Sequence, residues 1–95
     1  MNLEILETIK KHISNVLGVE LVKANTERDA EAFNIKFSGA TTCIYISRPF
    51  IHLLKESADI NSDLKDLDIL SIVKANPLCN ISLNFGGIKI EPINQ

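Results

Sequence analysis

Near its carboxyl end the sequence has two short segments of alternating apolar and polar residues, joined by Gly86-Gly87. A period of two is typical of a β-strand with one buried face, and glycine adopts the positive φ angles of tight hairpin turns at little cost. With Gly86-Gly87 as the loop, Phe85 lies opposite Ile88 and faces the core. The apolar side chains of both segments then share one face of the pair. These residues therefore predict a β-hairpin.

A second hairpin is predicted around Gly39-Ala40, where Gly39 suits the first central position of a type II′ turn. The strands on either side again alternate, with aromatic and aliphatic residues on one face. The expected cross-strand pairs are Phe37 with Thr42, Ile35 with Ile44, and Phe33 with Ile46. A short strand from Val19 to Ala24 precedes this hairpin. We expect the strands to form one mainly antiparallel sheet of about five strands.

Three helices are predicted from apolar periodicity and from residues typical of helix ends. The segment from Leu3 to Leu17 repeats apolar residues along one stripe, as a core-facing helix does. Pro49 begins a second helix, at a position where its missing N–H costs nothing. The expected buried residues of this helix are Phe50, Ile51, Leu53 and Leu54. The third helix runs from Asp63 to Ala75, with Asn61 or Ser62 as its amino-terminal cap.

The predicted order of elements is α-β-β-β-α-α-β-β. The expected fold class is an α+β two-layer structure with the helices on one face of the sheet, and residues 1–95 are expected to form a single domain. This order is similar to that of small acidic secretion chaperones and of several immunity-type inhibitors. The similarity is one of topology without matched motifs, and a fold does not by itself imply a function.

Composition argues against several classes of partner. The formal net charge of -2, with interspersed signs, gives no basic stripe for nucleic acid. No apolar run approaches the roughly 20 residues of a membrane span, and the amino terminus lacks the basic region of a signal peptide. Cys43 and Cys79 are too few for a disulfide framework, and we expect both to remain thiols. A reducing, cytoplasmic location is therefore expected.

Neither a metal nor another cofactor is expected. The segment from Asp59 to Asp63 matches the start of a calcium loop, but leucines stand where that loop needs a glycine and a bidentate glutamate. His12, His52, Cys43 and Cys79 lack the paired spacing of metal sites. A catalytic Cys-His pair would need a histidine on the sheet face that carries Cys43, away from the helices. We therefore expect a protein that is not an enzyme.

The predicted third helix carries more apolar residues than one packed face can cover, because they spread almost all round the helical wheel. If its leucines pack on the sheet, Ile69, Ile72 and Val73 form a second apolar side. An exposed apolar side commonly marks an interface. We therefore expect an interface at Ile69, Ile72 and Val73. Homodimerisation is its simplest use, because a self-complementary patch closes under two-fold symmetry.

The leading functional hypothesis is a small protein-binding module that acts as an inhibitor, adaptor or chaperone-like regulator. Its expected partner is a protein. Binding to nucleic acid or to a membrane is not expected. The alternative is a small-ligand-binding protein or enzyme subunit that uses the outer sheet face. Its candidate ligand-binding residues are Lys36, Cys43, Tyr45 and Lys89. A concave pocket with converging polar groups favours the alternative, and an apolar surface patch favours the protein-binding module.

Overall fold

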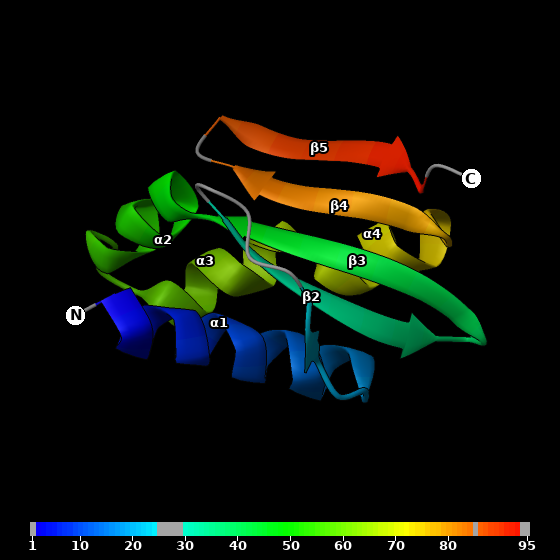
Figure 1. Cartoon of the computed structure of the whole chain (residues 1–95). Coiled ribbons are helices and arrows are strands. Elements are labelled where there is room, and N and C mark those ends of the chain that lie inside the picture. The colour runs from blue at the N-terminus through cyan, green and yellow to red at the C-terminus, as the bar shows by residue number, and fades with distance from the viewer. Residues whose placement is uncertain (1, 25–29, 85, 94–95) are drawn as a thin grey trace.

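The structure, a computed structural model, describes residues 2–24, 30–84 and 86–93. Its elements in chain order are α1 Asn2–Leu17, β1 Val22–Lys23, β2 Ala30–Phe37, β3 Ala40–Ser47, α2 Arg48–Lys55, α3 Ile60–Leu67, α4 Ile69–Ala75, β4 Cys79–Asn84 and β5 Gly87–Pro92. The strands form one five-stranded sheet, and the helices pack on one of its faces (Figure 1). This confirms the predicted α+β class, although two helices, α3 and α4, replace the predicted third helix. Among the helices of the described ranges, none has the length and apolar character that a membrane crossing requires.

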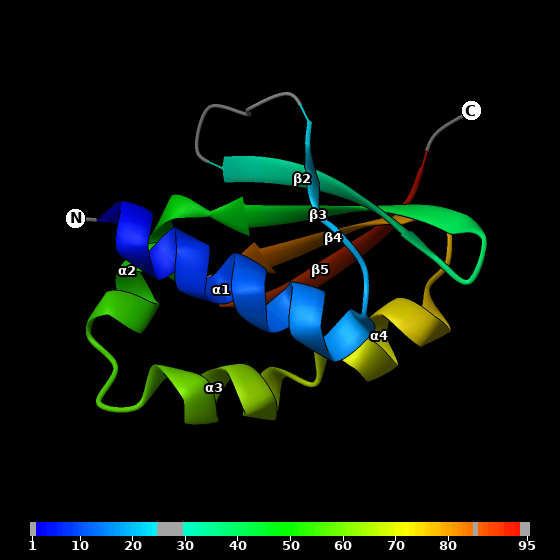
Figure 2. The ribbon, with the colours of Figure 1, turned by 90° about the horizontal axis from the view of Figure 1, so that it is seen from below.

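The strands follow the order β1-β2-β3-β4-β5, with β3 and β4 parallel and the other neighbours antiparallel. Parallel neighbours need a long crossover, and α2, α3 and α4 supply it on one side of the sheet (Figure 2). Four side chains at the centre of the sheet face this helical layer and are each 0% exposed. They are Ile44, Ile46, Ile81 and Leu83. The core therefore lies between the central strands and the helices.

The first hairpin forms at the predicted place, but its turn lies one residue earlier. Phe37 pairs with Ala40, so the loop is Ser38-Gly39. Ser38 and Gly39 have φ angles of 54° and 81°. Positive φ at both loop residues is typical of a type I′ turn rather than the predicted type II′. Gly39 therefore occupies the second loop position, and the predicted cross-strand pairs are wrong by two residues.

The second hairpin shows the same difference. Asn84 pairs with Gly87 and Leu83 with Ile88, so Gly87 belongs to the strand rather than to the loop. Phe85, predicted to face the core, lies outside the described residues. A register shift of two residues leaves each side chain on its predicted face, because the side-chain period of a strand is two. The alternating pattern therefore predicts the faces correctly and cannot by itself distinguish the two registers.

Helix α2 begins at Arg48, one residue before the predicted start at Pro49. The hydroxyl of Ser47 accepts a hydrogen bond from the backbone N–H of Phe50 at 3.2 Å, and Pro49 lies in the first turn. Phe50 and Leu54 are buried as predicted. Leu53, predicted to be buried with them, is 42% exposed, because it lies on the side of α2 that faces an open groove towards α3.

The predicted third helix is interrupted at Asp68. This residue has left-handed backbone angles, with φ 51° and ψ 55°, which aspartate tolerates better than most residues. Its N–H donates to the carbonyl of Lys65 at 3.2 Å at the end of α3, and its carbonyl accepts from the N–H of Ile72 at 3.3 Å at the start of α4. The helical wheel of one continuous helix therefore does not apply across Asp68.

The interruption gives each short helix its own buried side, which corrects the predicted interface at Ile69, Ile72 and Val73. Ile69 is 0% exposed and Val73 is 2% exposed. Ile72 is partly buried against the same core, and Leu64 of α3 is buried there as well. The apolar residues of the predicted helix are therefore core within one chain. The prediction of a dimer through Ile69, Ile72 and Val73 rested on their exposure, and it is therefore no longer supported.

The cap of α3 is Asp59, and not Asn61 or Ser62 as predicted. The carboxylate oxygen Oδ1 of Asp59 accepts a hydrogen bond from the N–H of Ser62 at 3.2 Å. Helix α3 consequently begins at Ile60, ahead of the predicted start. Asp63 then falls in the first turn, where a negative charge is favourable near the positive end of the helix dipole.

Replacing the cap residue tests this assignment. Asp59→Ala should lower the free energy of unfolding by about 0.5–2 kcal/mol, because a first-turn amide loses its acceptor. Asn61→Ala, at an exposed position of the same turn, should change it by less than about 0.5 kcal/mol. Urea unfolding followed by circular dichroism measures both variants. A larger loss for Asn61→Ala than for Asp59→Ala would show that the cap is misplaced.

The core position of Ile69 predicts a large cost of truncation. Ile69→Ala should lower the free energy of unfolding by about 2–5 kcal/mol, because removing a buried side chain leaves a cavity. Ser71→Ala is the matched control on an exposed position of α4 and should stay within about 0.5 kcal/mol of the unsubstituted protein. A loss below about 1 kcal/mol for Ile69→Ala would favour the surface position that the sequence predicts.

Candidate protein-binding groove

A groove between α2 and α3 has an apolar floor and an acidic rim. Its volume is about 490 Å³, and its lining residues are Phe50, Leu53, Leu54, Glu56, Ser57, Asp63, Asp66 and Leu67. Phe50 and Leu54 are buried in the floor, and Leu67 is partly buried beside them. Leu53 is exposed within the groove. The exposed acidic side chains that line it are Glu56, Asp63 and Asp66.

Helical spacing explains why these residues meet. On α2, Phe50, Leu53 and Leu54 stand at i, i+3 and i+4, and they therefore share one face of the helix. The residues of α3 that line the groove have the same spacing and are Asp63, Asp66 and Leu67. The two faces border one depression, and its least exposed apolar residues, Phe50, Leu54 and Leu67, form the floor.

Side-chain hydrogen bonds hold the turn between the two helices. The hydroxyl of Ser57 donates to the carboxylate of Asp63 in the first turn of α3 and accepts from the N–H of Asp59 at 3.1 Å. At the end of α2, the N–H of Glu56 donates to two carbonyl groups of the last turn. These bonds fix the end of the groove at which Glu56 and Asp63 lie.

The rim of the groove is acidic, since three of its lining residues are Asp or Glu and none is Lys or Arg. In the part of the chain that the structure describes, no group of three or more His, Cys, Asp or Glu side chains is placed to hold a metal ion. The acidic side chains instead line the same groove as the apolar ones. An arrangement of this kind is complementary to a surface that presents apolar side chains flanked by Lys or Arg.

The four residues of the alternative ligand site share the outer sheet face, but they are spread over β2, β3 and β5. Tyr45 and Lys89 lie in one cross-strand row with Ser82 between them. Two strand spacings, about 10 Å, therefore separate their backbones. Cys43 lies on β3 and is 8% exposed. Lys36 lies towards the far end of β2, beyond the row that contains Cys43.

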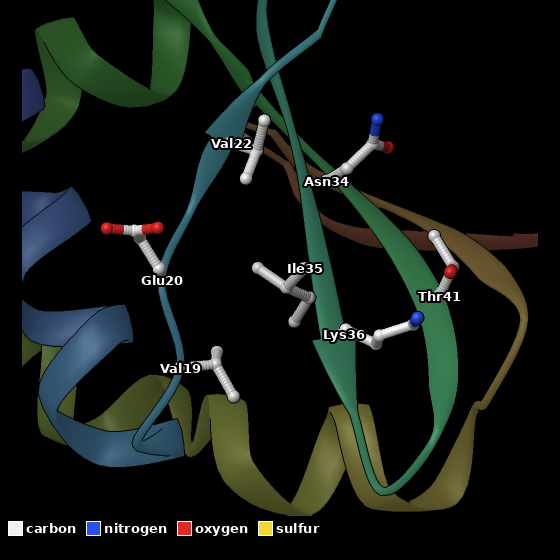
Figure 3. A pocket seen from close by; sticks show the side chains of 7 residues that line it. All are labelled: Val19, Glu20, Val22, Asn34, Ile35, Lys36 and Thr41. Atoms are coloured by element: carbon white, nitrogen blue, oxygen red, sulfur yellow. The ribbon is translucent and has the colours of Figure 1, made fainter.

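A separate cavity of about 410 Å³ lies beside Lys36, where the chain between α1 and β1 diverges from β2 (Figure 3). Val19, Val22 and Ile35 supply its apolar lining. The gap exists because the pairing of this segment with β2 begins at Val22 and continues through Lys23 and Ala24, after the chain has passed Val19 and Glu20. Lys36 is the sole lining residue that belongs to the predicted ligand site. This cavity therefore does not bring the four predicted residues together.

The structure also keeps both histidines away from Cys43. His12 is on α1 and His52 is on α2, and the helices pack on the sheet face opposite to the one that carries Cys43. Cys43 of β3 pairs with Asn80, the residue that follows Cys79. Because neighbouring residues of a strand point to opposite faces, the two sulfurs lie on opposite sides of the sheet and form no disulfide.

The sequence contains a signal for this groove that its periodicity alone does not reveal. Residues 56–68 hold five acidic residues and a single basic residue, Lys65. This local acidic excess indicates a negatively charged surface. Which acidic side chains line one groove is decided by the turn between α2 and α3, and the same turn leaves Leu53 open to solvent.

No family model, curated protein or solved structure matches this chain. The chemistry of the groove is therefore defined by its own residues. Its two features are a floor of leucine and phenylalanine side chains and a rim of three acidic side chains.

The different exposures of Leu53 and Leu54 predict a small loss of stability for one alanine substitution and a large loss for the other. Leu54→Ala should lower the free energy of unfolding by about 2–5 kcal/mol, because Leu54 is 3% exposed and its removal leaves a cavity. Leu53→Ala should lower it by less than about 1 kcal/mol. Chemical unfolding of the two variants under one set of conditions measures both values. Equal losses would show that Leu53 is core, as the sequence predicts.

Proposed function

We propose that this chain is a small protein-binding module that recognises a partner segment through the α2–α3 groove. The observation that carries this proposal is that apolar side chains and three acidic side chains line the same groove. The partner segment is amphipathic. Its apolar side chains fill the groove, and its Lys or Arg side chains meet Glu56, Asp63 and Asp66.

Leu53 is the main anchor on this side of the contact. It is 42% exposed in the single chain. Burying a fully exposed leucine side chain contributes roughly 1.5–3 kcal/mol, so covering the exposed part of Leu53 contributes roughly 1 kcal/mol. The acidic rim contributes less to affinity and more to specificity and to the rate of association, because exposed charges are well solvated. A module of this kind acts by holding its partner, as an inhibitor, adaptor or chaperone-like regulator, rather than by catalysis.

The chemistry of the groove also supports a class of partner and a compartment. An acidic rim repels the phosphates of nucleic acid, which favours a protein partner. Cys43 and Cys79 are thiols, and this agrees with a reducing compartment such as the cytoplasm. The alternative, a small-ligand site on the outer sheet face, has less support, because its four residues do not converge on the cavity beside Lys36.

A pair of synthetic peptides tests the proposed partner chemistry. Both form one amphipathic helix with leucines at i, i+3 and i+7, and the polar flanks carry Lys in one peptide and Glu in the other. The Lys peptide should bind, as measured by fluorescence anisotropy, and the Glu peptide should bind roughly tenfold more weakly or not at all. Equal affinity for the two peptides, or binding of neither, would contradict the proposal.

Variants locate the binding site of the Lys peptide. Leu53→Ala and Asp66→Lys should each weaken its binding roughly tenfold, the first by removing an apolar anchor and the second by reversing a rim charge. Glu4→Lys is the matched control, because it makes the same change of charge at an exposed position on α1. Its affinity should be unchanged at physiological salt. An equal effect of Glu4→Lys and Asp66→Lys would indicate non-specific attraction instead of a groove.

A further inference from the structure

Strand β5 forms an exposed edge of the sheet. All six of its residues are exposed. Ile88 and Ile90 lie opposite Leu83 and Ile81 on the face that carries the helices. The two inner residues are 0% exposed, whereas Ile88 is 37% exposed and Ile90 is 39% exposed. The difference arises because the helices lie across the inner strands and β5 extends beyond them (Figure 1).

The backbone of β5 is oriented so that the same two isoleucines carry the free hydrogen-bonding groups. The N–H of Ile93 donates to the carbonyl of Leu78, the residue opposite it, at 3.0 Å. Bonded and non-bonded pairs alternate along an antiparallel ladder. Counting along the register from Ile93 places Lys89 and Glu91 in bonded pairs with β4. The N–H and C=O groups of Ile88 and Ile90, and the C=O group of Pro92, therefore point away from β4, towards the open edge.

We propose that this edge pairs with β5 of a second copy of the chain, antiparallel and about a two-fold axis, with Ile90 opposite Ile90 of the second copy. The two Ile90 residues then exchange both of their backbone hydrogen bonds. The N–H of Ile88 donates to the carbonyl of Pro92 in the second copy. The sheets of the two copies become continuous, and Ile88, Ile90 and Pro92 of each copy form one apolar strip.

Charge complementarity selects this register. On the outer face, Lys89 of each copy lies opposite Glu91 of the other, next to the Lys89–Glu91 ion pair of 3.8 Å within each chain. A shift of two residues in one direction places Lys89 opposite Lys89, and the same shift in the other direction places Glu91 opposite Glu91. Like charges directly opposite each other are unfavourable. The charges therefore favour one pairing over its neighbours.

Lysine and proline on an edge strand commonly prevent such pairing. Here Pro92 lies at the end of β5 and needs to supply only its carbonyl, so its missing N–H removes no bond from the central pair. Lys89 meets an opposite charge. The other edge of the sheet is unlike β5, because β1 is two residues long and Lys23 there is bonded to Glu31 at 2.6 Å. The second copy is therefore expected on β5.

Charge exchange across the two-fold axis tests the register by sedimentation equilibrium. The unsubstituted protein should be dimeric, and Lys89→Glu or Glu91→Lys should each raise the dimer dissociation constant roughly tenfold or more, since each creates two repulsive pairs. The double exchange of Lys89→Glu with Glu91→Lys should restore the dimer. The matched control is Lys36→Glu, on the same sheet face but away from β5, and it should leave the dimer unchanged.

Amide hydrogen exchange gives a second measurement on the folded protein. The amides of Ile88 and Ile90 should be protected in the dimer and exchange rapidly in the Lys89→Glu variant, whereas those of Lys89 and Glu91 stay bonded to β4 in both. Three results would overturn the proposal. They are a protein that is monomeric at all concentrations, a dimer in which the Ile88 and Ile90 amide hydrogens exchange rapidly, and an unchanged dimer dissociation constant in the Lys89→Glu and Glu91→Lys variants. The β5 contact shares no residue with the α2–α3 groove, so each surface is tested independently.

Discussion

The parallel pairing of β3 with β4 is the constraint on which the rest of the structure depends. Ile44 lies beside Ile81 and Ile46 beside Leu83, and these four side chains are the apolar centre of the sheet. Parallel strands cannot be joined by a tight turn, so the chain must cross over one face of the sheet. The crossover consists of α2, α3 and α4, and it covers the central strands. It therefore determines which side of the sheet becomes the core.

The shape of the crossover depends on Asp68. A straight helix of this composition would leave apolar side chains on its outer side. The left-handed conformation at Asp68 changes the direction of the chain between α3 and α4, and Leu64, Ile69 and Val73 then all reach the core. The turn between α2 and α3, held by the hydrogen bonds of Ser57, positions the first turn of α3 beside the end of α2. The groove is thus a consequence of the way the crossover folds.

The two surfaces proposed for contacts with other molecules differ in physical character. The α2–α3 groove offers side chains, with an exposed leucine inside an acidic rim. The edge at β5 offers backbone hydrogen-bonding groups together with Ile88 and Ile90. The groove suits recognition of a different, basic partner. The edge is complementary to itself, because a two-fold axis places Lys89 of each copy opposite Glu91 of the other. The two proposals therefore concern different partners.

Apart from the break of the third helix at Asp68, the sequence by itself determined the type and order of the elements and the faces of the hairpin strands, because these follow from periods of two and 3.6 residues along the chain. Local periodicity carries no information on a register shift of two residues. The position of the first hairpin loop, at Ser38-Gly39, could therefore be assigned only from the structure. Tertiary structure also decided that Ile69 and Val73 are core and that Leu53 is surface. Burial depends on which elements pack together, and a backbone change at one residue, Asp68, is enough to redirect a whole helical face.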